Sequence, residues 1–447
     1  MAERRSRTAT TAAARLKRGG FDYVRCQFID LIGIARNRLV PAAQIPKAVE
    51  RGLAFGAFGT TLDIDDIPSD PALGSHSGDM WAVPDLHSLV PIPWLTSTGH
   101  MFCDLVAGDG SPYPSDPRSK LAALTQEFSR AVGAPQFAYE AEGYLLVKTA
   151  AGRYEPAYRG HGWNADLLDV HSPFIDELAG VLSVMDVPVE RLQVEGGYSQ
   201  FEAALRHGAP IDAAQDHFRF KQAFRAIARR HGLVGTFMPK PLPDRDGSGL
   251  HVHISARRGT KDALFAGHEL SVTGRHFVGG LIEHAGALVA IGCPSINSYK
   301  RMQPGFWAPT HAFWGVDNRS ALVRIVSSER HGRRIEFRAG DGTCNPFLLG
   351  AALLAAGLDG VRRKLDPGDP FNEDVARSSA ADLARHGIVR TPWSLDRALD
   401  ALEADDALAR VLGPELVQAF LHVKRSESAK FSAYVSDWEY RYYAEQH

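Results

Sequence analysis

The segment from Asn297 to Pro346 constrains this chain more than any other, because five of its arginines lie on strand-like sequence around one carboxylate. The arginines are Arg301, Arg319, Arg324, Arg334 and Arg338, and the carboxylate between the last two is Glu336. A guanidinium group presents a planar fork of donors that matches carboxylate and phosphate oxygens. The cluster therefore predicts a pocket for an anionic ligand beside a metal, with solvated strand faces and structural ion pairs as the alternative.

Length and composition limit the class of protein. A chain of 447 residues is expected to form two domains. Its formal net charge of -2 and its charged content of 23% give no sign of binding to nucleic acid or to a membrane surface. No apolar run has the length of a membrane span. The four cysteines have no paired spacing, so they fit neither a zinc site nor a disulfide framework and indicate a reducing, cytoplasmic location.

The expected elements divide the chain into three parts. Residues 1–20 are rich in arginine and are expected to form a tail that leads into a helix. Residues 21–113 contain a hairpin about Gly33 and short apolar runs broken by proline, which predict a small, mostly β domain. Residues 114–447 form the second domain. Its predicted strands are 137–148, 236–243 and 251–255, and its predicted helices are 119–132, 166–182, 217–231, 277–291, 346–364 and 394–446.

Two pairs of glutamates are candidates for metal binding. Glu140 and Glu142 lie two residues apart in a strand and so share one face, where like charges are costly unless a cation lies between them. Glu195 and Glu202 flank a glycine pair that allows a sharp turn, which would bring both carboxylates to one side. The alternatives are solvent-facing glutamates on an edge strand and acids near a helix N-terminus.

A histidine pair follows a glycine-rich loop. His251 and His253 share one face of a strand, and neutral imidazole is a common metal ligand, although a single buried histidine is usually a core residue. Carboxylates with one imidazole suit Mg²⁺ or Mn²⁺ better than a metal that prefers thiolates. Together with the arginines they are sufficient for a two-metal phosphoryl-transfer site. The sequence has no Walker A motif, kinase glycine loop or GxSxG elbow.

In their order along the chain, these motifs resemble the glutamine synthetase family of ATP-dependent carboxylate–amine ligases. The matching segments are FAYEAEGYLL (137–146), VEGGYSQFE (194–202), TFMPKP (236–241), GSGLHVHIS (247–255), NSYKR (297–301), DNRSALVRI (317–325) and RRIEFR (333–338). The resemblance implies an α+β fold, with a small β-grasp-like N-terminal domain and a large catalytic domain on a curved antiparallel sheet. It also implies a homo-oligomer, a dodecamer of two hexameric rings with active sites shared between neighbouring subunits.

The resemblance also implies a role for each matching residue. One Mg²⁺ or Mn²⁺ would be held by Glu142, Glu195 and Glu202, and the other by Glu140, His251 and Glu336. Glutamate would be bound by Gly247, Arg301 and Arg338. ATP would be bound by His253, Ser255, Arg319, Arg324 and Arg334, with Arg319 and Arg338 as catalytic residues. The γ-carboxylate of glutamate would take the γ-phosphate of ATP, and an amine would then displace phosphate to give an amide.

The chain departs from the family at its ammonium site. The family has a flap glutamate in a PGxEAP context, where this chain has Trp307 within Pro304–Pro309. The segment that matches the family's N-terminal aspartate, residues 54–61, contains no acid, and the next one is Asp63. Phe306 and Trp307 instead offer apolar area and a ring face. We therefore expect an organic amine, whether aromatic, alkyl or polyamine, as in the γ-glutamylpolyamine, γ-glutamylethanolamide and γ-glutamylanilide synthetases.

Three other functions stay open, and the last of them keeps the ligase chemistry but changes the acid substrate, although Arg301 and Arg338 favour an α-amino acid such as glutamate. A true glutamine synthetase could use ammonia through a site rebuilt from other residues. A non-catalytic homologue is the second alternative, although it would have little reason to keep every metal-ligand position. The sequence does not identify the amine.

Overall fold

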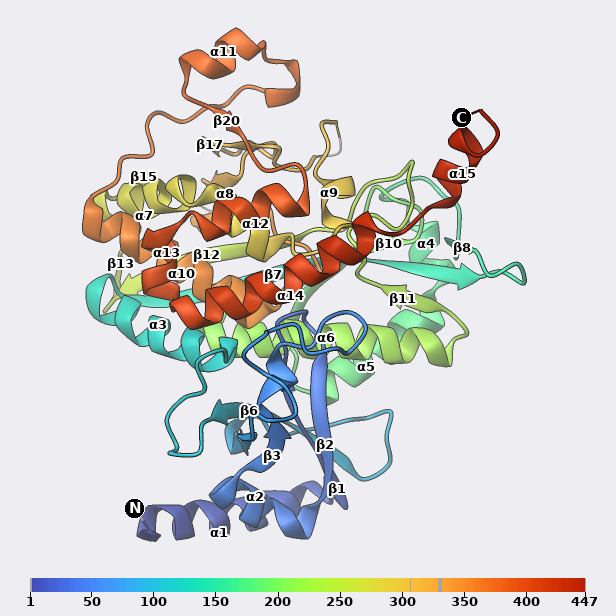
Figure 1. Cartoon of the computed structure of the whole chain (residues 1–447), viewed down its shortest axis with the longest axis vertical. Helices are drawn as coiled ribbons and strands as arrows, with labels where there is room; N and C mark the ends of the chain where they lie inside the picture. Colours follow the sequence, from blue (N-terminus) through green and yellow to red (C-terminus); the bar gives the residue numbers. More distant parts are fainter. Residues whose placement is uncertain (1, 306, 329–331, 447) are drawn as a thin grey trace.

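Two β-sheets organise the computed structural model, which describes residues 2–305, 307–328 and 332–446 (Figure 1). The strands of the smaller sheet are β1 (Tyr23–Ile29), β2 (Ala35–Pro41), β3 (Leu53–Gly56), β4 (Asp79–Pro84), β5 (Val90–Pro91) and β6 (Thr98–Val106). Their order is β2-β1-β6-β4-β3, with β5 also paired to β6. β1 and β2 form the predicted hairpin, with Gly33 at a φ of 78° between them.

The larger sheet crosses the centre of the molecule. Its strands are β7 (Ala134–Lys148), β8 (Tyr154–Pro156), β9 (Val189–Val194), β10 (Gln200–Leu205), β11 (Val234–Thr236), β12 (Leu250–Arg258), β13 (Lys261–Asp262), β17 (Trp314–Val316), β18 (Val323–Val326) and β19 (Arg334–Phe337). Their main order is β17-β18-β19-β12-β7-β10-β9, antiparallel except for β17 and β18. Two small pairs complete the strands, β14 (Phe265–Ala266) with β15 (Glu269–Leu270) and β16 (His311–Ala312) with β20 (Val389–Arg390).

Helices pack against both sheets, most of them against the larger one, and the α+β class predicted from the sequence is confirmed (Figure 1). They are α1 (Ala2–Gly19), α2 (Ile45–Arg51), α3 (Pro117–Ala131), α4 (Asp166–Val170), α5 (Ser172–Val184), α6 (Pro210–Arg230), α7 (Val272–Glu283), α8 (Ala285–Gly292), α9 (Ser298–Arg301), α10 (Pro346–Arg363), α11 (Ala380–Arg385), α12 (Leu395–Glu403), α13 (Asp406–Leu412), α14 (Pro414–Ser432) and α15 (Asp437–Tyr443). Within the described chain, no helix combines the length and apolar character needed to cross a membrane.

The alternation of β7 separates a packed face from an open one. Tyr139 and Ala141 are buried in the main core, where the Tyr139 hydroxyl donates to the Pro346 carbonyl at the start of α10. Glu140 and Glu142 point to the opposite face, because successive side chains of a strand alternate. The helical layer therefore supports the sheet from one side and leaves its other face for polar chemistry.

The first twenty residues differ from the expected tail. Residues 2–19 form the single helix α1, in which Ala12 and Leu16 are 0% and 4% exposed. These two side chains lie four residues apart, on one face of the helix, and they pack into the core of the smaller sheet. Apolar contact therefore orders at least this part of the segment.

Two other expectations about elements are wrong. The predicted strand at 236–243 ends at Thr236 with β11, because prolines occupy three of the next seven positions and cannot donate to a ladder. The predicted helix at 277–291 is divided into α7 and α8, which meet at His284. The C-terminal segment from 394 is likewise divided, into α12, α13, α14 and α15.

His284 links three parts of the helical layer. Its Nδ1 lies 2.7 Å from an Asp405 carboxylate oxygen and its Nε2 lies 3.0 Å from an Asp359 oxygen, while its own exposure is 2%. Asp405 also caps α13, and Asp359 belongs to α10. Burial alone would lower the pKa of His284, but the hydrogen bonds and charges of the two aspartates outweigh burial and raise it.

Replacing His284 by alanine should destabilise the protein in a pH-dependent way. The change leaves the largely buried Asp405 without its cation, at a cost of about 3 kcal/mol, while Asp359 keeps its ion pair of 2.8 Å with Arg363. A raised folded-state pKa means that the stabilisation is complete below the unfolded value of about 6.5 and is lost as the pH rises through the folded value. Urea unfolding of both proteins at about pH 6 and about pH 9 should therefore give the larger difference at the lower pH. An equal or larger difference at the higher pH would contradict this role for His284.

Candidate active site

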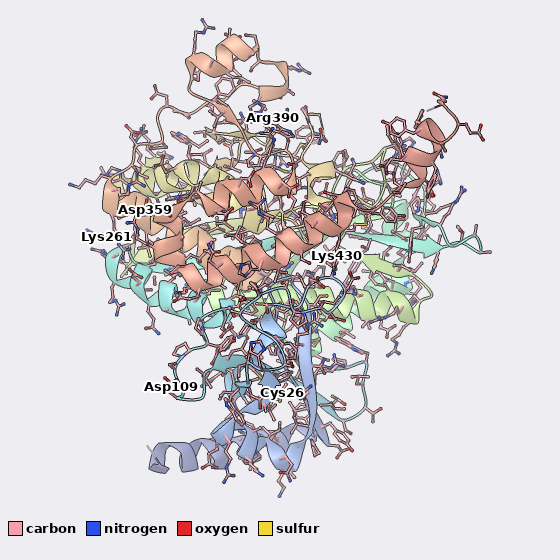
Figure 2. All side chains as sticks on the ribbon, in the orientation of Figure 1. Cys26, Asp109, Lys261, Asp359, Arg390 and Lys430 are labelled. Atoms are coloured by element: carbon pink, nitrogen blue, oxygen red, sulfur yellow. The ribbon has the colours of Figure 1, made fainter. Side chains whose placement is uncertain are left out.

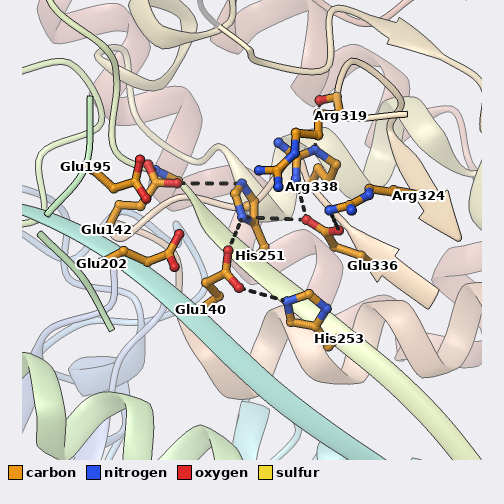
Figure 3. A network of polar contacts seen from close by, with 12 residues as sticks. Glu140, Glu142, Glu195, Glu202, His251, His253, Arg319, Arg324, Glu336 and Arg338 are labelled. Carbon is orange, nitrogen blue, oxygen red and sulfur yellow. Dashed lines mark hydrogen bonds and ion pairs between the residues drawn. The ribbon is translucent and has the colours of Figure 1, made fainter. Parts of the chain in front are cut away.

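Strand pairing places two histidines beside two glutamates on the open face of the larger sheet (Figure 3). His251 on β12 lies opposite Glu140 on β7, and His253 lies opposite Glu336 on β19. Residues directly opposite one another in an antiparallel pair share a face, so all four side chains meet there. The structure thus joins residues that are almost 200 positions apart in the sequence.

The hairpin of β9 and β10 adds two more glutamates. Glu202 lies opposite Glu142 on β7, and Glu195 directly follows β9, where its N–H closes the turn onto β10. The turn requires glycine at Gly197, because a Cβ there would overlap the Tyr144 hydroxyl. The sharp turn expected from the glycine pair is therefore present, and it returns Glu195 to the side of Glu142 (Figure 3).

The glutamates of this half of the site repel one another. Burial and the charges of neighbouring glutamates raise the pKa of Glu202 to about 9. Burial and the charge of Glu142 also raise the pKa of Glu195. Oxygen donors of this kind are the ligands of Mg²⁺ and Mn²⁺, so the set fits a divalent cation that Glu142, Glu195 and Glu202 would hold. In the part of the chain that the structure describes, no three acidic, histidine or cysteine side chains already converge on one point, so a cation would have to draw them together.

The opposite half of the site is rich in cations. Glu336 is 1% exposed, contacts the Arg338 guanidinium and accepts a hydrogen bond of 3.0 Å from Arg324. Burial alone would raise its pKa, but the charges of Arg338, the two histidines and Arg324 lower the pKa of Glu336 to about 2. The His251 Nδ1 lies 3.4 Å from a Glu140 oxygen and 3.7 Å from a Glu336 oxygen. These three groups could hold a second cation.

Arg301 lies on helix α9, not on the strand expected from the sequence. Its exposure is 4%, and its two terminal nitrogens donate to the carbonyls of Gly340 at 3.1 Å and Arg338 at 3.2 Å. A Cβ at Gly247 would lie 2.5 Å from the Arg301 Cγ, and one at Gly249 would lie 2.7 Å from its Nη2. The glycine-rich loop before β12 is thus required by the close approach of this arginine.

Arg319 also lies outside the strands of the structure, although its sequence is strand-like. It lies in the turn between β17 and β18, which Asn318 stabilises by accepting hydrogen bonds from the N–H and hydroxyl of Ser320. An asparagine that bonds to the backbone two residues ahead favours such a turn over a strand. The Arg319 carbonyl accepts a hydrogen bond of 3.0 Å from the Arg338 Nε, which brings the two arginines together (Figure 3).

The remaining predicted ATP-binding residues follow the sheet. Arg334 on β19 donates from its Nε to the Nδ1 of His253 at 3.0 Å. Ser255 lies two residues beyond His253 on β12, and therefore on the same face. Arg324 on β18 lies opposite Glu336. These residues extend the row of polar groups along one side of the site.

Trp307 lines a cavity that also contains Arg319 in its wall. Its side chain is 67% exposed, its φ is 56°, and with Arg319 it lines a cavity of about 490 Å³. Phe306, the other residue predicted for the amine pocket, lies outside the described residues.

Sequence reasoning missed Arg191. This residue of β9 lies 3.0 Å from a Glu202 oxygen and 3.9 Å from a Glu140 oxygen. Arg191 and Gln193 alternate along β9, and Glu195 follows in the same period just beyond it, so the period of a strand was the signal that could have found Arg191.

Comparisons with known proteins identify relatives of the whole chain. The family model described as "Glutamine synthetase, catalytic domain" matches residues 114–443. The chain is 32% identical to a glutamine synthetase of Methanocaldococcus jannaschii over 434 residues, 95% of each chain. It is 32% identical to that of Thermotoga maritima over 429 residues, 94% of this chain and 96% of the other. A solved GmaS/ADP complex is 31% identical and superposes with a TM-score of 0.86 over 97% of this chain and 99% of the other.

Divalent cations should stabilise the protein through Glu142, Glu195 and Glu202. A cation present at 100 times its Kd stabilises the folded state by about 2.7 kcal/mol. We expect Mg²⁺ or Mn²⁺ to raise the Tm above its value in EDTA, and the Glu202→Gln variant to lose most of this increase, as measured by thermal unfolding. Glu190→Gln, an exposed change on the same hairpin, is the control and should respond as the unchanged protein does. Equal increases in the Glu202 and Glu190 variants would exclude Glu202 as a ligand.

Proposed function

This chain belongs to the glutamine synthetase family of ATP-dependent ligases that form C–N bonds, and we propose that it joins glutamate to an organic amine instead of ammonia. The product would be a γ-glutamyl amide, formed through γ-glutamyl phosphate. The observation that carries the proposal is Trp307, which stands at the flap position where the family has a glutamate. Without that carboxylate, a small cation has lost one of its few partners.

The cavity beside Trp307 supports a substrate larger than ammonium. Its volume of about 490 Å³ is within the range of small-molecule sites. Its apolar lining residues are Pro304, Gly305, Trp307, Ala308, Val316, Val375 and Ala376. Arg319 also lines the cavity, which therefore adjoins the catalytic arginines. An amine whose body lies on this apolar wall would present its nitrogen towards the site.

The backbone around the cavity adds support. Trp307 and Asp317, both cavity residues, have φ values of 56° and 53°. A residue other than glycine in the left-handed region costs about 1 kcal/mol or more, and such residues concentrate at functional sites. The fold holds both side chains on the wall of the cavity despite this cost.

Asp63 is the first acid after the segment that matches the family's ammonium-binding aspartate, and its carboxylate is already paired with other residues of the chain. Asp63 is 2% exposed and accepts hydrogen bonds of 2.7 Å from Ser426 and 2.6 Å from Lys430, both on α14. Lys430 is labelled on this helix in Figure 2. Burial alone would raise its pKa, but these bonds lower the pKa of Asp63 to about 2. A carboxylate paired in this way does not replace the missing acid.

The side chains that line the cavity suit each of the three kinds of amine expected from the sequence. Trp307 offers a ring face to an aromatic or alkyl amine. Asp317 and Asp374 also line the cavity, so the second ammonium of a polyamine would find carboxylates there. All three kinds of amine stay within the proposed class.

The mechanism assigns two tasks to the arginines. Arg301 and Arg338 would hold glutamate, while Arg319, Arg324 and Arg334 would neutralise charge on the transferring phosphate. Bound divalent cations, Mg²⁺ or Mn²⁺, would add further charge neutralisation at the phosphate oxygens. The γ-carboxylate attacks the γ-phosphate of ATP and releases ADP, and the amine then attacks the acyl phosphate and releases phosphate. Trp307 would help to exclude water, which would otherwise hydrolyse the intermediate.

The organisation of the protein around this site is also proposed. We place the domain boundary between residues 113 and 114, where the family match begins. Members of this family form oligomers, and a dodecamer of two hexameric rings is the assembly that we infer from the resemblance. The cysteine pattern supports a cytoplasmic location.

An amine panel tests the proposal directly. With glutamate and ATP, phosphate release should have a higher kcat/KM for at least one organic amine than for ammonia. Trp307→Glu restores the flap acid and should shift the ratio towards ammonia by about tenfold, the equivalent of 1.4 kcal/mol. Trp438→Glu, on the exposed helix α15, controls for the added charge. If ammonia outperforms every organic amine, the protein is a glutamine synthetase, and if no amine supports turnover of ATP, it is a non-catalytic homologue.

A further inference from the structure

Arg191 reaches the carboxylate-rich half of the site from β9. Its Nη2 lies 3.0 Å from the Glu202 Oε1 and 3.9 Å from the Glu140 Oε2. Its side chain is 55% exposed, while those of the two glutamates are 6% and 19% exposed. A half-exposed arginine side chain therefore pairs with carboxylates that are largely buried.

Arg191 is the one lysine or arginine that pairs with the glutamates in this half of the site, among the residues that the structure describes. Between the described residues, no other lysine or arginine lies within 4.0 Å of a carboxylate oxygen of Glu142, Glu195 or Glu202. Glu336, by contrast, has two arginines at such a distance. Among the lysines and arginines that the structure describes, Arg191 is thus the one that faces these three carboxyl groups, and it contacts Glu202.

A divalent cation would require the same oxygen atoms. Because the Arg191 side chain is half exposed, water screens this ion pair, and the arginine can move into solvent at small cost. Carboxylate oxygens bind Mg²⁺ and Mn²⁺ directly, and two cations placed side by side on Glu202 would repel one another. Metal binding and the Arg191 contact therefore oppose each other.

We propose that Arg191 is a positioning residue, the counter-ion of Glu202 and Glu140 in the metal-free protein, and that it gives way to the divalent cation. It holds Glu202 and Glu140 in place before the cation arrives, and it lowers the affinity for the cation that replaces it. The inference rests on the proposed role of these glutamates as metal ligands. It concerns the metal centre and is independent of which amine is used.

Titration with Mn²⁺ in the absence of nucleotide tests the competition. Arg191→Ala should bind Mn²⁺ about threefold to fivefold more tightly than the unchanged protein, as measured by isothermal titration calorimetry. Arg191→Lys keeps a cation and should fall between the two. Arg206→Ala removes an exposed arginine just beyond β10 and should leave the affinity unchanged.

Thermal unfolding gives a second readout without activity. In EDTA the Arg191→Ala variant should have a lower Tm than the unchanged protein, and saturating Mn²⁺ should reduce the difference. Equal or weaker Mn²⁺ binding by Arg191→Ala would overturn the proposal while leaving the metal site intact. If Glu202→Gln binds Mn²⁺ as well as the unchanged protein does, the metal site itself is wrong and the inference fails with it.

Discussion

Repulsion between glutamates on one face of the larger sheet is the constraint that determines where the site needs positive charge. A strand that alternates with period two cannot place Glu140 and Glu142 anywhere but side by side, and pairing with β10 brings Glu202 against them. The fold meets this cost unequally. Histidines and arginines crowd around Glu336, whereas the opposite half is left to a single half-exposed arginine. The side with unbalanced charge is the one that a divalent cation would complete.

Much of the site could be predicted because strand periodicity is local. Alternation was enough to place Glu140 with Glu142 and His251 with His253 on common faces, and the glycine pair was enough to predict the turn before Glu202. The order of the motifs, and the family that they resemble, needed nothing beyond the sequence. What joins the motifs is register between strands far apart in the chain, and a single sequence gives no direct signal for it.

The errors have a common physical origin. Arg301 was expected on a strand, but it lies on the short helix α9. Its guanidinium holds this helix by donating to the Gly340 and Arg338 carbonyls. The break between α7 and α8 depends on His284, which bonds to aspartates more than seventy residues away. Arg191 was missed because its partners lie on other strands. In each case tertiary contacts decide a feature that local propensity leaves open.

The two halves of the site are built from different material. Most of the side chains proposed for metal and phosphate stand on paired strands, where a shift of one residue would turn them to the wrong face. The Trp307 cavity is lined mainly by connecting segments, within residues 304–320 and 372–376, with Val316 at the end of β17. Loops accept insertions and exchanges that strands do not. The choice of nucleophile can therefore diverge while phosphoryl transfer is preserved, and a library confined to these loops could retarget the enzyme without rebuilding its centre.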